Sequence, residues 1–528
     1  MNSLKKYQGA INSAGLSRRE FITKLSALGL SVSLAPLISP TTSFGKAPAK
    51  GGTFRLGVRD YASTDSLDPT TPNGKGMWCL NYQLRNNLIE EGVKGKLIPE
   101  LAESWDSSPD LTKWVFKIRR GVEFSNGKPL EAEDVVHSIN IHRDKSTKSS
   151  VASLLAPITD IKLSARNEIT ITLSSGNIDF PAILTIRHVV IVPRDREAML
   201  KGVGTGGYIL ENFEPGVRSI ARRNPNYWKE DRAHFDEIEV VGISDVTSRT
   251  NALISGQLDA IGFCDRRTLD LLARNDTVQI LRSTGKTHYY FPMRVDTKPY
   301  DNKDVRKALK YAVDRKHIVN TILNGYGTVG NDQPINAAYP FYADDLPQID
   351  YDPDKAKFHL KKSGMQDTTF EIYVSNTPFS GAVDTAVLMQ QHALKAGINI
   401  KVNQVPEDGY WSDTWKKKPW YASMKSGYTT ENIMLSTVYQ STAAWNETYW
   451  KNERFDKLLI AARSEKSTEK RREMYREMQA IIATEGGSLI PMFADIVDAA
   501  STKIGYGKIA ANEELDGLRC GERWWFKS

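Results

Sequence analysis

Residues 97–143 read LIPELAESWDSSPDLTKWVFKIRRGVEFSNGKPLEAEDVVHSINIHR, and no other stretch of the chain says more about its fold. Trp114, Phe116 and Ile118 fall on every second position, which predicts a strand with one buried face. The Asn-Gly pair at 126–127 then gives the backbone the freedom that a tight turn needs.

A helix is predicted directly after this turn. Val135, Val136 and Ile139 recur at helical spacing, and Pro129 separates them from the strand. Acidic residues fill the first turn of this segment, where they interact favourably with the helix dipole. The pattern therefore predicts a strand, a turn and an amphipathic helix, in that order.

The residues of this stretch also carry a family signature. The run P-x-L-A-E-S-W at 99–105, followed by W-x-F-x-I-R-x-G-V-x-F-S-N-G-x-P-L-x-A-x-D-V at 114–135, resembles the family 5 extracellular solute-binding proteins. These are the peptide, opine and nickel receptors of bacterial ABC importers. Further family landmarks follow at 204–208 (GTGGY), 223–228 (RNPNYW), 299–315, 455–459 and 476–482, so the resemblance continues almost to the end of the chain. Residues 235–240 alternate as a strand, and 351–356 begin a helix with Asp352 placed to cap it.

The resemblance implies an α/β, two-lobed periplasmic-binding-protein fold (type II, cluster C) with three domains and a ligand cleft between the lobes. Carried onto this numbering, domain I is discontinuous and comprises 50–86, 204–290 and 494–528. Domain II, at 87–203, is inserted into domain I, and domain III occupies 291–493.

The first 49 residues are expected to be an export signal. Residues 17–22 (SRREFI) fit the twin-arginine pattern, and the apolar run at 25–38 is shorter than the ~20 residues that a membrane-spanning helix needs. Small residues at 47–49 suit cleavage before Lys50. The alternative is an N-terminal membrane anchor, which the short apolar run disfavours. No cysteine follows the run, so lipid anchoring through a signal-peptide cysteine is not indicated.

Removal of this signal changes the charge of the protein. Residues 1–49 hold six Lys or Arg residues and one Glu, so the rest of the chain would carry +2 rather than +7. Such a balance does not indicate binding to nucleic acid or to a membrane surface. Cys79, Cys264 and Cys520 form no metal-binding spacing. One disulfide among them is possible, which would leave one thiol over.

Catalytic signatures are missing from the sequence. The eight histidines form no H-E-x-x-H motif, and no G-x-S-x-G elbow occurs. The glycine-rich segment 202–207 lacks the Lys-Ser/Thr pair of a phosphate loop, so we interpret it as a crossover between domains. We expect no cofactor, no metal ion and no catalytic residue.

Aromatic residues are concentrated in 410–450, and they indicate where a ligand binds. Tyr and Trp offer large, rigid contact surfaces that suit a cleft around an organic solute. We predict that Trp411, Tyr428 and Trp445 contact the ligand, although each could instead fill a hydrophobic core. Trp411 and Trp415 would share a face if this segment is helical.

The resemblance also raises a question about ligand charge. In peptide-binding relatives, the segment matching 424–435 usually carries an aspartate for the ligand's amino group, but that position falls here on Gly427 or Tyr428. We therefore predict that Glu431 or Lys425 reads charged groups of the ligand, the alternative being that both face solvent. The stretch 376–380 (NTPFS) lacks the arginine that dipeptide receptors use for the carboxylate.

The opposing lobe is predicted to contribute Met77, Trp78, Tyr289 and Tyr290. As a whole, the sequence predicts a monomeric, soluble periplasmic receptor that binds a peptide-like solute and delivers it to an ABC permease in the inner membrane. Two alternatives stay open: a receptor of the same fold for an opine, oligosaccharide or metal chelate, and a secreted enzyme that is exported folded.

Overall fold

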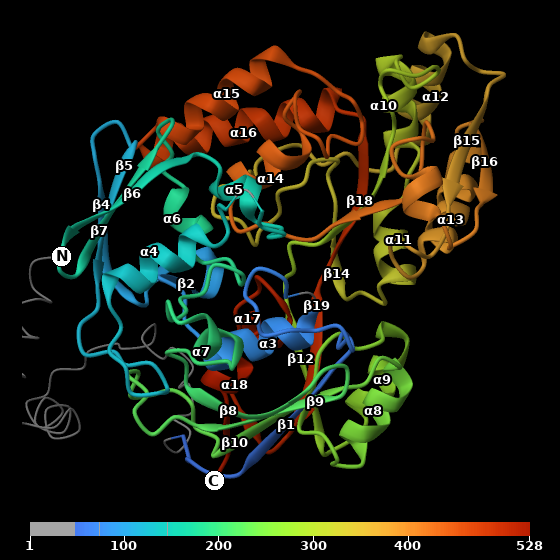
Figure 1. Cartoon of the computed structure of the whole chain (residues 1–528). Coiled ribbons are helices and arrows are strands. Elements are labelled where there is room, and N and C mark those ends of the chain that lie inside the picture. Colours follow the sequence, from blue (N-terminus) through green and yellow to red (C-terminus); the bar gives the residue numbers. More distant parts are fainter. Residues whose placement is uncertain (1–47, 73, 145) are drawn as a thin grey trace, which may run out of the picture. The chain divides into compact units, whose positions relative to one another are not determined.

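The computed structural model describes residues 48–72, 74–144 and 146–528 (Figure 1). The predicted twin-arginine signal lies outside the described residues, apart from its last two positions. Within the described part of the chain, every helix is too short or too polar to span a bilayer.

The elements expected between residues 97 and 143 are confirmed. β5 (Lys113–Ile118) buries Trp114, Phe116 and Ile118. α4 (Ala132–Asn140) begins after Glu131, whose backbone N–H donates to the Asp134 carboxylate at 3.0 Å. This contact satisfies a backbone donor at the helix start.

β5 belongs to a four-stranded antiparallel sheet in the order β4-β5-β7-β6. Its other strands are β4 (Ala102–Ser107), β6 (Ile158–Ala165) and β7 (Glu168–Leu173). The buried sides of α4 and of this sheet form one hydrophobic core. The same region holds β2 (Ile89–Glu91), η1 (Val93–Gly95), β3 (Leu97–Pro99), α5 (Ala152–Leu155), α6 (Phe180–Ile183) and α7 (Arg196–Leu200).

A seven-stranded mixed sheet is built from distant parts of the chain, in the order β12-β19-β11-β1-β10-β9-β8. The strands are β1 (Thr53–Val58), β8 (Tyr208–Glu214), β9 (Arg218–Arg223), β10 (Glu237–Gly242), β11 (Ala260–Ile261), β12 (Val278–Ser283) and β19 (Ile496–Ser501). Around it lie α3 (Lys75–Leu84), α8 (Val246–Ile254), η2 (Arg266–Thr268), α9 (Leu269–Ala273), β20 (Ile504–Gly505), α17 (Glu514–Gly517), α18 (Cys520–Arg523) and β21 (Trp525–Phe526).

The remaining region contains a four-stranded sheet in the order β14-β18-β13-β17 and the parallel pair β15-β16. Its strands are β13 (His288–Pro292), β14 (Gly327–Val329), β15 (Thr369–Val374), β16 (Asn399–Gln404), β17 (Ser423–Lys425) and β18 (Ser488–Ala494). Its helices are α10 (Lys303–Tyr311), α11 (Arg315–Ile322), α12 (Pro353–Ser363), α13 (Ala382–Leu394), η3 (Tyr410–Thr414), α14 (Glu431–Val438), α15 (Glu453–Ser464) and α16 (Thr468–Glu485).

The chain passes directly between the seven-stranded sheet and the β14-β18-β13-β17 sheet at two places. β12 leads into β13 through residues 284–287, and β18 leads into β19 through the single residue Asp495. Few residues therefore join these two parts of the molecule at this point, and both links lie beside the cavity described below.

The structure decides three local expectations. The alternating segment at 235–240 forms β10 only from Glu237, because Phe235 instead stacks on Phe54 with ring centres 4.5 Å apart. Cys79, Cys264 and Cys520 are all buried and unpaired, so the possible disulfide does not form in the structure. The predicted cap of α12 is confirmed, since the Asp352 carboxylate accepts the Lys355 N–H at 2.9 Å.

Candidate functional site

A cavity of about 630 Å³ lies between the seven-stranded sheet and the β14-β18-β13-β17 sheet. This volume is in the range of sites that enclose small organic ligands. Both chain links between the sheets contribute to its wall, through Lys286, Thr287 and Asp495. The other wall segments include 263–267, 321–324, 376–381 and 512–514, with Arg59, Lys75, Met424, Ser426 and Gly427.

The strand register decides which side chains of β13 and β17 reach this cavity. Tyr289 pairs with Met424, and both line the cavity. Tyr290 pairs with Ser423 one position further along, so these two side chains point to the opposite face of the sheet. Of the two predicted tyrosines, only Tyr289 is therefore part of the cavity wall.

The predicted residues of α3 lie behind the wall. Met77 is buried in the core beneath the seven-stranded sheet. The Trp78 ring is covered by the Arg187 guanidinium, 3.5 Å from the ring centre, and Lys75 lies 5.0 Å from the same ring. Trp78 thus supports Lys75, which lines the large cavity, and Arg187, which lines the smaller one, and does not line the large cavity itself.

Lys425 lies on the face of β17 that turns away from the cavity. Its Nζ is 2.5 Å from Glu447 Oε1, and both side chains are buried. The Trp445 ring centre is 4.9 Å from this ammonium and that of Trp415 is 5.8 Å away. Burial and the Lys425 charge lower the pKa of His288 to about 3, so this neighbour is neutral.

The aromatic segment divides between surface and cavity. Trp411 and Trp445 are half exposed, and Trp411 packs edge-on against Trp415 with ring centres 6.3 Å apart. Tyr428 lines a smaller cavity that shares Gly427 with the large one. The structure therefore separates the predicted ligand-binding residues instead of gathering them, and their role in binding stays a prediction.

Glu431 is the first residue of α14 and is buried. Its Oε1 accepts the backbone N–H of Phe341 at 2.6 Å, and it is absent from the wall of the large cavity. Burial raises the pKa of Glu431 to about 6, although the Phe341 hydrogen bond acts in the opposite direction. The Glu431 carboxylate is therefore held by a hydrogen bond within the protein, from the Phe341 N–H.

Glu431→Gln should make the stability of the protein less dependent on pH. A carboxyl group with a raised native pKa binds more protons in the folded than in the unfolded state, so stability falls as pH rises from about 4.5 to about 6. The glutamine can still accept the Phe341 N–H. The free energy of unfolding, measured with urea at pH 4.5 and at pH 7, should fall between these two pH values by about 2 kcal/mol less in the variant than in the wild type. An unchanged pH profile would contradict the assignment.

Several charges around the large cavity are already paired. Lys75 and Arg187 bind Glu513 at 2.5 and 2.6 Å. Burial alone would raise the pKa of Glu513, but these two cations hold it below its usual range. Lys286 binds Glu91 at 3.3 Å and the Thr429 carbonyl oxygen at 3.1 Å.

Gly427 makes the position of Lys286 possible. A Cβ atom at 427 would lie 2.1 Å from the Lys286 Cβ, so any side chain there would displace the lysine stem. The loop at Gly427 thus packs directly against a buried cation.

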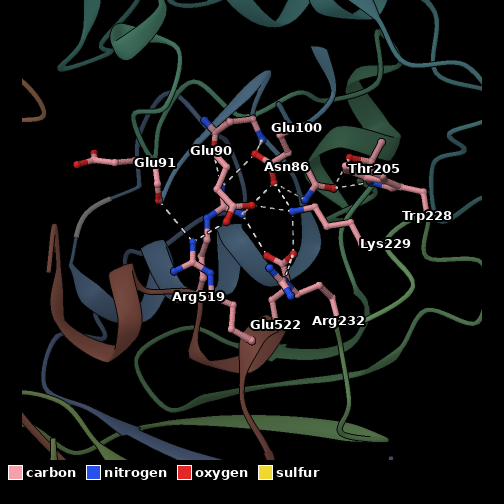
Figure 2. Close-up of polar contacts among 12 residues, drawn as sticks. Asn86, Glu90, Glu91, Glu100, Thr205, Trp228, Lys229, Arg232, Arg519 and Glu522 are labelled. Atoms are coloured by element: carbon pink, nitrogen blue, oxygen red, sulfur yellow. Dashed lines mark hydrogen bonds and ion pairs between the residues drawn. The ribbon is translucent and has the colours of Figure 1, made fainter. Parts of the chain in front are cut away.

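Three buried carboxylates outside the cavity approach one another as metal ligands would. Oxygen atoms of Glu90, Glu100 and Glu522 lie within 4.8 Å of each other. Figure 2 shows Lys229 pointing into this group, and its Nζ is 2.8–2.9 Å from all three. Burial alone would lower the pKa of Lys229, but the charges of Glu100 and Glu522 raise it well above its usual value. The Lys229 ammonium therefore lies where a metal ion bound by the three carboxylates would lie.

Comparison with known proteins identifies the family of this chain. Residues 96–449, more than half of the chain, match the model of the bacterial extracellular solute-binding proteins, family 5 Middle. The chain belongs to this family. The resemblance drawn from residues 97–143 is thereby confirmed.

Individual family 5 relatives span most of the chain. Heme-binding protein A of Haemophilus influenzae is 28% identical over 450 residues, which cover 76% of this chain and 80% of that protein. Di/tripeptide-binding protein 1 of Pseudomonas aeruginosa is 25% identical over 430 residues, covering 73% and 79%.

Solved structures establish the fold of this family 5 chain. The periplasmic binding protein DppA from Helicobacter pylori, in complex with the peptide STSA, superimposes with a TM-score of 0.74 at 20% identity. The match covers 91% of this chain and 99% of that one. The fold is the two-lobed α/β fold of periplasmic binding proteins, as predicted, and the protein is a substrate-binding protein of the ABC-transporter class.

Proposed function

We propose that this protein binds a peptide-like organic solute in the 630 Å³ cavity and delivers it to an ABC permease. The observation that carries the proposal is the position of β17, the last strand of its sheet, whose continuation at Ser426 and Gly427 lines the cavity. An extended peptide can add to such an edge through main-chain hydrogen bonds. Relatives named for di/tripeptide and glutathione binding support this class of ligand.

We further propose that the two parts of the molecule close around the solute. The short links at 284–287 and Asp495 would act as the hinge, and closure requires the solute to bind the closed form better. The proposal keeps the predicted domains (50–86 with 204–290 and 494–528; 87–203; 291–493). It is supported by three large hydrophobic cores, each of which draws most of its members from one of these domains. In this proposal the protein is a monomer without catalytic activity.

Localisation belongs to the same proposal. Arg18 and Arg19 support export by the twin-arginine route, with removal of residues 1–49 and release as a soluble periplasmic protein. The family is extracellular by description, which agrees with this destination.

One experiment tests these points together. The protein is purified natively from the periplasmic fraction. The mass of its polypeptide should correspond to a chain that begins at Lys50, and the native mass should include a retained peptide-like solute. Small-angle scattering before and after removal of that solute should show a smaller radius of gyration for the loaded form. A radius that does not change would contradict closure, and a fixed redox cofactor or metal cluster would favour the enzyme alternative.

A further inference from the structure

Phe263 is an exposed aromatic residue in the wall of the large cavity. The residue is 45% exposed, and it belongs to none of the hydrophobic cores of the described residues. The Arg59 guanidinium carbon lies 3.8 Å from the ring centre, and Arg59 lines the same cavity. The ring and the guanidinium therefore form a stacked pair beside the cavity.

The backbone of Phe263 is held in an unfavourable conformation. Its φ of 55° is in the left-handed region, which bulky residues rarely adopt. The buried Asp498 carboxylate accepts the N–H of Phe263 at 3.3 Å and that of Leu515, another left-handed residue, at 2.6 Å. Packing around Asp498 thus imposes the conformation that keeps the ring out of the core.

Strain of this kind persists where the surroundings enforce it, and it is concentrated at functional sites. A glycine at position 263 would favour the stability of the fold, because glycine adopts positive φ without steric cost. The ring contributes little packing to compensate. Its position is therefore better explained by contact with a ligand than by folding.

We propose that Phe263 and Arg59 form a platform that stacks on a planar, aromatic group of the solute and binds an acceptor next to it. Aromatic rings and guanidinium groups both stack on planar groups. Among the described residues the only ion pair of Arg59 is through Nε, with Asp60 at 3.1 Å, which leaves its terminal nitrogens to donate to a carboxylate or carbonyl of the solute. The inference rests on the proposed function, since it names the chemical group of the solute that the cavity would recognise.

The test uses benzoate and cyclohexanecarboxylate, which share a carboxylate but differ in planarity. In saturation-transfer NMR titrations, benzoate should bind the wild type about two- to tenfold more tightly, the fold-change expected for one aromatic contact. Phe263→Gly should remove this preference while its thermal unfolding midpoint stays equal or rises. Phe263→Tyr should keep the preference.

Two results would overturn the platform: equal binding of both acids to the wild type, or an unchanged preference in Phe263→Gly. A fall in the unfolding midpoint of Phe263→Gly would show instead that the ring is structural. Phe358→Ala, at a 62% exposed phenylalanine outside the cavity wall, is the matched control and should change neither readout. Failure to bind any peptide would count against the proposed function alone, because the two acids test the platform without a peptide.

Discussion

Lys229→Met should destabilise the protein by about 3–5 kcal/mol, because it leaves three buried carboxylates without their shared ammonium. Arg519 Nη1 remains within 4.0, 3.0 and 3.1 Å of Glu90, Glu100 and Glu522, and Arg523 remains bound to Glu90 (Figure 2 shows Arg519). The two guanidinium groups already balance two of the three carboxylates, so loss of Lys229 leaves one buried negative charge uncompensated. Urea unfolding followed by circular dichroism measures the effect.

A second substitution makes this prediction specific. Adding Glu522→Gln to Lys229→Met removes one uncompensated charge and should recover part of the lost stability. Lys355→Met is the matched control, because Lys355 pairs with Asp352 at the surface and its loss should leave the midpoint nearly unchanged. A Lys229→Met midpoint equal to that of the control would refute the central role of the ammonium.

Lys425→Met should destabilise the protein by a similar amount, about 3–5 kcal/mol, because Glu447 would stay buried without a counter-charge. Lys425 is the only cation that forms an ion pair with Glu447 among the described residues, so the Glu447 charge depends on this lysine. The double variant Lys425→Met/Glu447→Gln removes both charges and should be clearly more stable than the single variant.

The same pair of variants decides the predicted role of Lys425 in ligand binding. If the ion pair is structural, the double variant should retain the affinity of the wild type for the solute that copurifies with it. If calorimetry instead shows weaker binding by the double variant at unchanged stability, Lys425 reads the ligand as the sequence suggested.

The site was less predictable than the elements that build it. Lys425 and Glu431 were identified as the charged residues of their segment, yet each has a buried protein partner, Glu447 and the Phe341 N–H. No motif marks Glu447, and no local pattern marks Phe263, whose importance comes from a backbone conformation and a cavity. Such relations are set by elements that pack together from distant parts of the chain.

The sequence by itself determined the local elements and the family. The twofold periodicity of β5, the capping of α12 at Asp352 and the signature in 97–143 depend on neighbours a few residues apart, which a linear pattern records. The tertiary structure alone decided which charges meet and which faces line the cavity. Lys229 reaches Glu90 and Glu522 across 139 and 293 positions, and the register of β13 against β17 sends Tyr289 toward the cavity and Tyr290 away from it. These outcomes follow from the packing of whole sheets, whose geometry no short stretch of sequence contains.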